Sequence, residues 1–240
     1  MRLAVVSDIH SNLAALDAVL DDLPEVDQIW ALGDIVGYGP QPNEVIARLR
    51  ERDVRAVLGN HDGAAIGTVD TSWFNVDAAT AVHWTATVID EPSRAWLASL
   101  PMRRTEGELT AVHGSPRDPI WEYVASPGVA RANLAEFGTR WCLCGHTHLP
   151  VIYHADRERV AAMEAIPGRP ITLDASRAIL NPGSVGQPRD GNPAASYLVF
   201  DTESRRAEYR RVAYDIAHTQ GLMREVDLPA RLVERLAWGR

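Results

Sequence analysis

Short apolar runs recur along the first sixty residues, and each run ends just before a polar side chain. The runs LAVVS, QIWAL and VRAVL precede Asp8, Asp34 and Asn60, which follow one another at equal steps of 26 residues. One strand and one helix of a parallel α/β unit occupy about this length. The pattern therefore predicts strands at residues 2–7, 28–32 and 53–58, separated by helices at 12–23 and 42–51. Asn12 is a suitable N-cap for the first helix, and Pro42 fits the first turn of the second.

The second half of the chain begins with helices and continues with short strands. Helical periodicity covers residues 76–89 and 91–100, and a hairpin through Gly107 is predicted at 102–113. A helix near 127–137 leads into the strand WCLC, and further strands are predicted at 150–155, 169–175, 177–182, 195–202 and 206–214, before a final helix at 228–238. Because no linker interrupts the chain, residues 1–240 are expected to form a single domain. This order predicts an α/β four-layer α-β-β-α sandwich, with two mixed sheets flanked by helices.

The composition is that of an ordinary globular chain, and it limits the classes of partner. Of the 240 residues, 46% are hydrophobic and 23% are charged, and the net charge is −8. This charge argues against an extended nucleic-acid surface, because such surfaces neutralise phosphates with Lys and Arg. The apolar run at the N-terminus is too short for a signal peptide, and no stretch approaches the length of a membrane span. Cys142 and Cys144 are expected to be buried thiols, because a CxC disulfide is strained. The protein is therefore expected to be cytoplasmic. Its assembly into a homo-oligomer remains an open alternative at this point.

Side chains of the metal-binding type follow five of the predicted strands. They are Asp8 and His10, Asp34, Asn60, His113, and the pair His146 and His148. Open α/β sheets have their binding sites at the carboxyl ends of the strands. These side chains are therefore expected to meet in one pocket that binds two metal ions. Mixed carboxylate and imidazole ligands suit divalent Mn, Fe, Co, Ni or Zn.

The order of these motifs resembles that of the calcineurin-like metallophosphoesterases. The chain contains DxH (Asp8, His10), GD (Asp34), GNHD (Asn60, His61, Asp62), an isolated His113 and GHTH (His146, His148), in that order. The segment NPGSVG, residues 181–186, resembles a loop of the small bacterial and archaeal members. A single one of these motifs carries little information, but five in order, each behind an apolar run, are very rare by chance. The resemblance implies a phosphoesterase, and the small phosphodiesterase-type members are the best match.

The resemblance also implies a role for each motif residue. Asp8, His10 and His148 would hold one divalent ion, Asn60, His113 and His146 a second, and Asp34 would bridge the two, with Mn the favoured metal. Two ions about 3.5–4 Å apart lower the pKa of a shared water, and the metal-bridging hydroxide then attacks phosphorus in line. His61 would protonate the leaving group. Asp62 is interpreted as a loop or helix-capping residue.

The segment after Asp34 bears on the substrate. Where the protein Ser/Thr phosphatases have GDxVDRG, this chain has GDIVGYG, so Gly37 and Tyr38 replace an Asp and an Arg. A dianionic monoester depends most on an Arg fork, so this departure favours hydrolysis of small or nucleotide-like phosphodiesters. Tyr38, Arg117 and Arg189 are the candidate substrate contacts, with solvated arginines and a packed tyrosine as the alternative interpretation.

Two other functions remain open at this point. One is a phosphomonoesterase, including a protein phosphatase. The other is a non-catalytic scaffold of the same fold. All the assigned ligands and His61 are present, which favours an enzyme.

Overall fold

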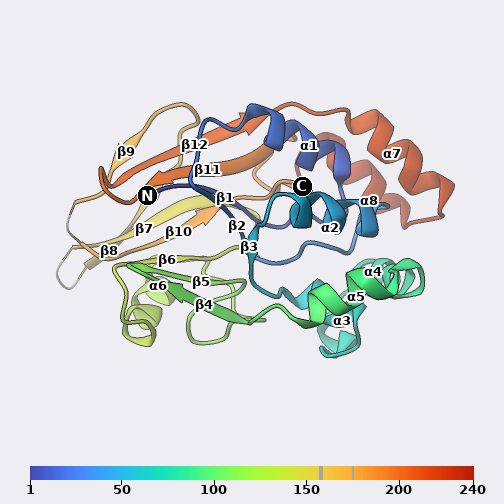
Figure 1. Cartoon of the computed structure of the whole chain (residues 1–240), viewed down its shortest axis with the longest axis horizontal. Coiled ribbons are helices and arrows are strands. Elements are labelled where there is room, and N and C mark those ends of the chain that lie inside the picture. Colours follow the sequence, from blue (N-terminus) through green and yellow to red (C-terminus); the bar gives the residue numbers. More distant parts are fainter. Residues whose placement is uncertain (157–158, 175) are drawn as a thin grey trace.

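Two six-stranded sheets packed face to face form the centre of the computed structural model, and helices cover their outer faces (Figure 1). The structure describes residues 1–156, 159–174 and 176–240. Both sheets contain parallel and antiparallel pairs of strands. The predicted four-layer sandwich of two mixed sheets is confirmed.

The first sheet is built around the N-terminal strand. Its strand order is β3 (Arg55–Ala56), β2 (Gln28–Ala31), β1 (Arg2–Val6), β11 (Ala195–Asp201), β12 (Arg206–Val212) and β9 (Ile171–Thr172). The strands β1, β2 and β3 are parallel, as their equal spacing along the chain predicts. The hairpin of β11 and β12 pairs with β1 in the antiparallel direction. The carboxyl ends of β1, β2 and β3 therefore lie side by side at one edge.

The second sheet repeats this arrangement with strands from the middle of the chain. Its strand order is β4 (Arg103–Glu106), β5 (Leu109–Val112), β6 (Trp141–Leu143), β10 (Ala178–Pro182), β7 (Pro150–Asp156) and β8 (Arg159–Glu164). The predicted hairpin through Gly107 is the antiparallel pair of β4 and β5. The strand β6 is parallel to both β5 and β10, so the strands before His113 and His146 end at the same edge.

Alternating side chains on the central strands divide the core into layers. Leu3 and Val5 of β1 lie between the sheets, whereas Val6 faces the helices on the outer side. The layer between the sheets is apolar throughout and includes Leu3, Val5, Trp30, Trp141, Leu143, Leu180, Leu198 and Phe200. This alternation is the period-two pattern of a strand that is buried on both faces.

Eight α-helices surround the sheets in the part of the chain that the structure describes. They are α1 (Leu13–Asp22), α2 (Pro42–Glu51), α3 (Asn60–Ala65), α4 (Val76–Val88), α5 (Glu91–Ala98), α6 (Pro127–Asn133), α7 (Ile216–Glu225) and α8 (Ala230–Arg235). Helix α1 packs on β11 and β12, and α6 packs on β7 and β8 of the other sheet. The predicted N-cap is confirmed, because Asn12 Oδ1 accepts a hydrogen bond from the Ala15 amide at 3.2 Å. None of the described helices is long and apolar enough to cross a membrane.

Several elements differ from the sequence predictions. The strand β8 was not predicted; it is an edge strand that buries none of its residues, and it forms by pairing with β7. Helix α7, capped by Asp215, and the short helix α3 were also not predicted. The strand expected at 169–175 shrinks to the two residues of β9 at the sheet edge, and its last residue, Ala175, lies outside the described residues.

The packing between the sheets leads to a prediction about stability. Phe200 is fully buried, and its ring centroid lies 5.0 Å from that of Trp141 in an edge-to-face arrangement. We expect Phe200→Ala to lower the free energy of unfolding by about 3–5 kcal/mol, because it leaves a cavity between two rigid sheets. Denaturant unfolding measures this loss. The matched control is Trp73→Ala, because Trp73 is 81% exposed. Equal losses in the two variants would contradict this account of the core.

Candidate metal centre

The seven predicted ligands meet where the carboxyl ends of β1, β2 and β3 in the first sheet come close to those of β5 and β6 in the second sheet. Asp8 and His10 follow β1, Asp34 follows β2, and Asn60 follows β3 in the first sheet. His113 follows β5, and His146 and His148 follow β6 in the second sheet. All seven side chains are buried: Asp8, His10, Asp34, Asn60, His113, His146 and His148. The structure therefore brings together every residue of the predicted ligand set.

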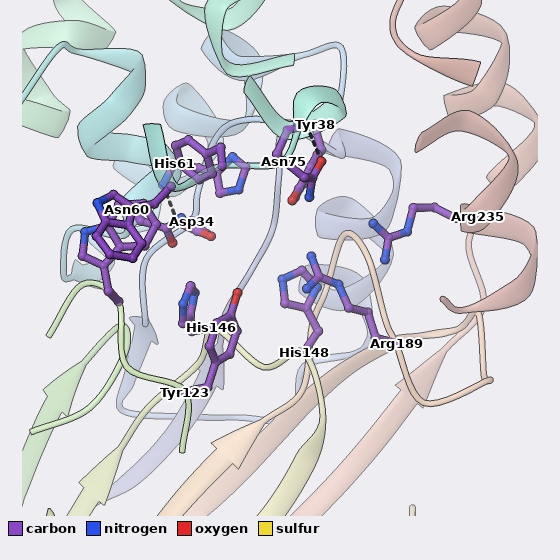
Figure 2. A pocket seen from close by; sticks show the side chains of 14 residues that line it. Asp34, Tyr38, Asn60, His61, Asn75, Tyr123, His146, His148, Arg189 and Arg235 are labelled. Carbon is purple, nitrogen blue, oxygen red and sulfur yellow. Dashed lines mark hydrogen bonds between the residues drawn. The ribbon is translucent and has the colours of Figure 1, made fainter. Parts of the chain in front are cut away.

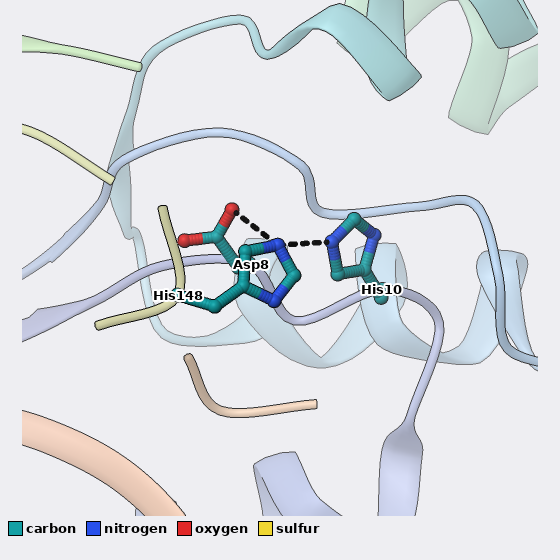
Figure 3. Close-up of side chains that lie close together, drawn as sticks. All are labelled: Asp8, His10 and His148. Carbon is teal, nitrogen blue, oxygen red and sulfur yellow. Dashed lines mark hydrogen bonds and ion pairs between the residues drawn. The ribbon is translucent and has the colours of Figure 1, made fainter. Parts of the chain in front are cut away.

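Asp8, His10 and His148 form one cluster (Figure 3). The Nε2 atoms of His10 and His148 lie 3.2 Å apart, and Asp8 Oδ1 lies 3.3 Å from His148 Nε2. Two turns at the ends of β1 and β6 thus aim one carboxylate and two imidazoles at a common point.

A second cluster surrounds His113. Its Nε2 atom lies 3.0 Å from both Asn60 Oδ1 and His146 Nδ1, and 3.3 Å from Asp34 Oδ2. The same Asp34 oxygen lies 3.7 Å from His10 Nε2 of the first cluster. Asp34 therefore stands between the two clusters, in the position that a bridging carboxylate requires.

The hydrogen bonds of the imidazoles test whether this donor set fits a cation. The Nδ1 atoms of His10, His113 and His148 face the backbone carbonyls of Val36, Leu32 and Gln187 at 3.2, 2.8 and 2.6 Å. Nδ1 therefore carries a proton in each ring, which leaves Nε2 of the neutral ring with a lone pair. The Nε2 lone pairs of His10 and His148 face each other at 3.2 Å, and neither atom donates a hydrogen bond to the other. A cation between them resolves the conflict, and this outward bond to a carbonyl is typical of histidines that bind metal.

Asn60 shows the same conflict. Its side-chain oxygen faces only acceptors, among them both oxygens of Asp34 and His146 Nδ1. Rotation of the amide would remove the conflict by hydrogen bonding, and a cation would remove it with the oxygen facing inward. The donor set of carboxylate, amide and imidazole therefore fits a divalent ion in each cluster.

The electrostatics of the clusters also favour a positive charge. Burial lowers the pKa of His10 and His148 well below its usual value, so both rings are neutral, the form that binds metal. Burial opposes the ionisation of Asp34, but His113 and His61 hold its pKa well below the usual value. Burial likewise opposes protonation of His113, yet the Asp34 carboxylate raises the pKa of His113 to about 9. The space around Asp34 thus attracts either a proton or a cation.

Backbone strain is concentrated in the turns that carry these side chains. Asp8, His10, Asp34, His146 and His148 all have positive φ, between 49° and 65°. Non-glycine residues rarely adopt this conformation, which persists where the surrounding structure enforces it and often marks a functional site. Gly59 is also constrained, because a Cβ atom there would lie 2.2 Å from Asp34 Oδ1.

His61 lies beside both clusters without belonging to the predicted ligand set. Its backbone amide donates to Asp34 Oδ1 at 2.9 Å, and its ring centroid lies 4.9 Å from that of His10. Its Nδ1 atom is buried and has no partner among the described residues. Gly37 packs against this ring, since a Cβ atom at residue 37 would lie 2.6 Å from His61 Nδ1.

Asp62 and the NPGSVG segment support the backbone of the site. The two carboxylate oxygens of Asp62 accept hydrogen bonds from the amides of Val36 and Gly59. This agrees with the interpretation of Asp62 as a capping residue. Ser184 Oγ donates to the carbonyl of Asp8 at 2.8 Å, so this loop holds the turn that presents Asp8.

A cavity of about 420 Å³ opens next to the clusters (Figure 2). Tyr38 and Arg189, two of the three candidate substrate contacts, line it. Arg117 does not line it, because its guanidinium pairs with Glu122, so the structure does not support the prediction that Arg117 contacts the substrate. The other residues of the wall include Trp73, Phe74, Asn75, Trp121, Tyr123 and Arg235.

Arg235 is a charged wall residue that the sequence analysis did not identify. It belongs to α8, far along the chain from the last motif. All 24 basic residues of the chain are arginines, and no local pattern distinguishes Arg235 from the others. Only the packing of α8 against the cavity brings it to the site.

The comparisons with known proteins agree with this geometry. A family model for the calcineurin-like phosphoesterase superfamily domain matches residues 1–205, so the chain belongs to that superfamily. The crystal structure of a metallophosphoesterase from Sphaerobacter thermophilus is 46% identical, covers 100% of this chain and 99% of its own, and superimposes with a TM-score of 0.92.

Two curated relatives differ in how much of the chain they share. An uncharacterised protein of Methanocaldococcus jannaschii is 38% identical over 99% of this chain and 98% of its own length. A symmetrical bis(5'-nucleosyl)-tetraphosphatase of Erwinia tasmaniensis is 42% identical over 58% of this chain, and the match spans about half (53%) of that enzyme.

The central position of Asp34 leads to a prediction about metal content. Loss of a residue that only supports a metal ligand weakens metal binding by about 10–100-fold. We expect Asp34→Ala to weaken it at least as much, because this substitution removes the carboxylate that both clusters share. Elemental analysis after gel filtration measures the metal-to-protein ratio. Asp53→Ala is the control, since Asp53 is an exposed carboxylate. Wild-type metal content in Asp34→Ala would contradict the bridging role.

Proposed function

We propose that this protein is a dinuclear metal-dependent phosphodiesterase that acts on small, nucleotide-like substrates. The observation that carries the proposal is the convergence of seven buried side chains of the metal-binding type, four of which, Asp34, Asn60, His146 and His148, line an open cavity. Residues 1–240 would act as one domain, since α8 contributes Arg235 to the cavity wall.

In this proposal each cluster holds one divalent ion. Asp8, His10 and His148 bind the first and Asn60, His113 and His146 bind the second, with Asp34 shared and Mn the favoured metal. When bound, such a pair supplies an activated water and neutralises the charge of the phosphoryl oxygens. The protein's own contribution is to hold the ligands rigidly, through the three imidazole-to-carbonyl bonds and the strained turns.

His61 is proposed as the general acid. The bond from its backbone amide to Asp34 fixes its position beside the clusters, and its ring lines the cavity. Burial lowers the pKa of His61 to about 4, so its imidazolium is a strong proton donor that is scarce at neutral pH. A bound phosphoester anion would stabilise the protonated form and receive its proton on the leaving oxygen.

The cavity wall favours a diester with an aromatic group. Gly37 and Tyr38 leave the site without the arginine that follows the GD motif in protein phosphatases, so a monoanionic diester suits it better than a dianionic monoester. Trp73, Phe74 and Trp121 form an apolar wall, in which the Phe74 and Trp121 ring centroids lie 5.4 Å apart. Such rings stack on nucleobases. The name of the partly matching tetraphosphatases points to the same substrate class.

The role of His61 is tested by removing its side chain. We expect His61→Ala to keep its metal and to lose activity by about 10²–10⁴-fold, the usual effect of removing a general acid. Turnover of bis(p-nitrophenyl) phosphate and elemental analysis are measured on the same preparation. His83→Ala is the control, since His83 is exposed on α4. Wild-type turnover in His61→Ala would rule out the proposed role.

The reaction itself is tested with a panel of metals and phosphoesters. Metal-stripped protein is reloaded with one divalent ion at a time and given aryl diesters and aryl monoesters. We expect the highest kcat/KM with Mn²⁺ and a diester, because the proposed site holds two ions and has Gly37 and Tyr38 where protein phosphatases have an Asp and an Arg. A preference for monoesters would favour a phosphatase. Full metal content without turnover on any phosphoester would favour a non-catalytic scaffold.

A further inference from the structure

Two arginines from distant parts of the chain face the cavity beside the metal centre. Arg189 follows the NPGSVG loop, and Arg235 is the last residue of α8. Both line the cavity, and Figure 2 shows their side chains on the same side of it, with Arg189 next to His148 and Arg235 farther out. Arg235 also lies beyond residues 1–205, the part that matches the superfamily model.

Neither guanidinium forms an ion pair with a carboxylate of the described residues. Arg189 donates to Gln187 Oε1 at 3.1 Å, and its buried Nε atom has no partner among the described residues. Arg235 donates through Nε to the backbone carbonyl of Arg240. Asp77, the acidic residue near Arg235 on α4, lies 3.9 Å from Arg231 instead. Most of the donor capacity of the two forks therefore remains available to a ligand.

The electrostatics of this arrangement are unfavourable without an anion. Both side chains are partly buried and carry the same charge. Burial and then the nearby Arg189 charge lower the pKa of Arg235 to about 10. Tyr38 stabilises the pair only weakly, since its ring centroid lies 6.0 Å from the Arg189 guanidinium carbon. Positive charges that converge in a concave, partly dry site attract anions.

We propose that Arg189 and Arg235 form a second anion subsite, which binds a phosphate group adjacent to the phosphate at the metal centre. This inference rests on the proposed function, because it assumes that the first phosphate lies at the two clusters. A planar guanidinium can donate two parallel hydrogen bonds to the oxygens of a phosphate group, so the side chains of Arg189 and Arg235 together suit one phosphate group. The substrate class is therefore a nucleotide with at least two linked phosphates, its aromatic group lying against Phe74 and Trp121.

Calorimetry with two adenosine nucleotides tests this subsite. The probes are AMP and the methylene-bridged analogue of ADP, in which a carbon atom replaces the oxygen between the phosphates. On protein reloaded with Mn²⁺, we expect the diphosphate analogue to bind about tenfold or more tightly than AMP, the effect of a charge-assisted hydrogen-bonded contact. Arg235→Gln should remove this preference, and Arg235→Lys should keep part of it because the charge remains.

Arg224→Gln is the matched control, since it removes an exposed arginine from α7, the helix packed against α8, and does not change the cavity wall. It should keep the wild-type preference. Equal binding of the two nucleotides by the wild type, or a full preference in Arg235→Gln, would overturn the subsite. Binding is measured without turnover, so an inactive wild-type protein that prefers the diphosphate analogue would refute the proposed reaction and leave the subsite standing.

Discussion

The position of the Asp34 carboxylate is the constraint on which the rest of the site depends. Its oxygens lie within 3.3 Å of His113 Nε2 and 3.7 Å of His10 Nε2, so one buried negative charge serves histidines of both sheets. Burial alone would favour the neutral acid, but His113 and His61 hold the pKa of Asp34 well below its usual value. Without a cation these groups compensate one another incompletely, because the remaining imidazole lone pairs face acceptors. A divalent ion in each cluster removes that cost.

The fold holds this arrangement by making both sheets end at the same place. The apolar layer between the sheets fixes the relative position of β1 and β6, and the turns after these strands carry Asp8 and His148. Small residues then allow the turns to approach, as Gly59 does against Asp34. Backbone hydrogen bonds hold some of these strained turns, among them the bonds from the Asp8 amide to the Gly33 carbonyl at 3.1 Å and from the His10 amide to the Asp34 carbonyl at 2.9 Å.

The charge distribution around the cavity explains how an acidic chain accommodates an anion. The net charge is −8, yet the carboxylates at the centre face the proposed metal sites, and the cavity wall carries two arginines that form no ion pair with a carboxylate of the described residues. The two arginines thus place positive charge on the cavity wall, which also includes the Asp34 carboxylate. The aromatic residues on another wall supply apolar surface rather than charge. This separation suits a ligand with a phosphate part and a flat, apolar part.

Local patterns in the sequence predicted much of this molecule. The equal spacing of Asp8, Asp34 and Asn60 reflects the length of one strand and one helix, a local quantity, so the parallel strands β1–β3 and the meeting of these three side chains at their ends were predictable. Where the local pattern is weak, prediction failed. The edge strand β8 buries none of its residues and forms by pairing with β7, and helix α7 buries only Thr219 and Met223.

The amino-acid sequence alone predicted the layers, the candidate ligand residues and the place of His61 beside Asn60, because these follow from periodicity, from the order of the motifs and from residues adjacent in the chain. Only the tertiary structure decided which arginines face the cavity. Arg117 was excluded by a pairing with Glu122, and Arg235 was brought in by the packing of α8. Both outcomes depend on contacts between side chains in space. No periodicity in the sequence shows whether Arg117 pairs with Glu122, five residues away, or lies in solvent.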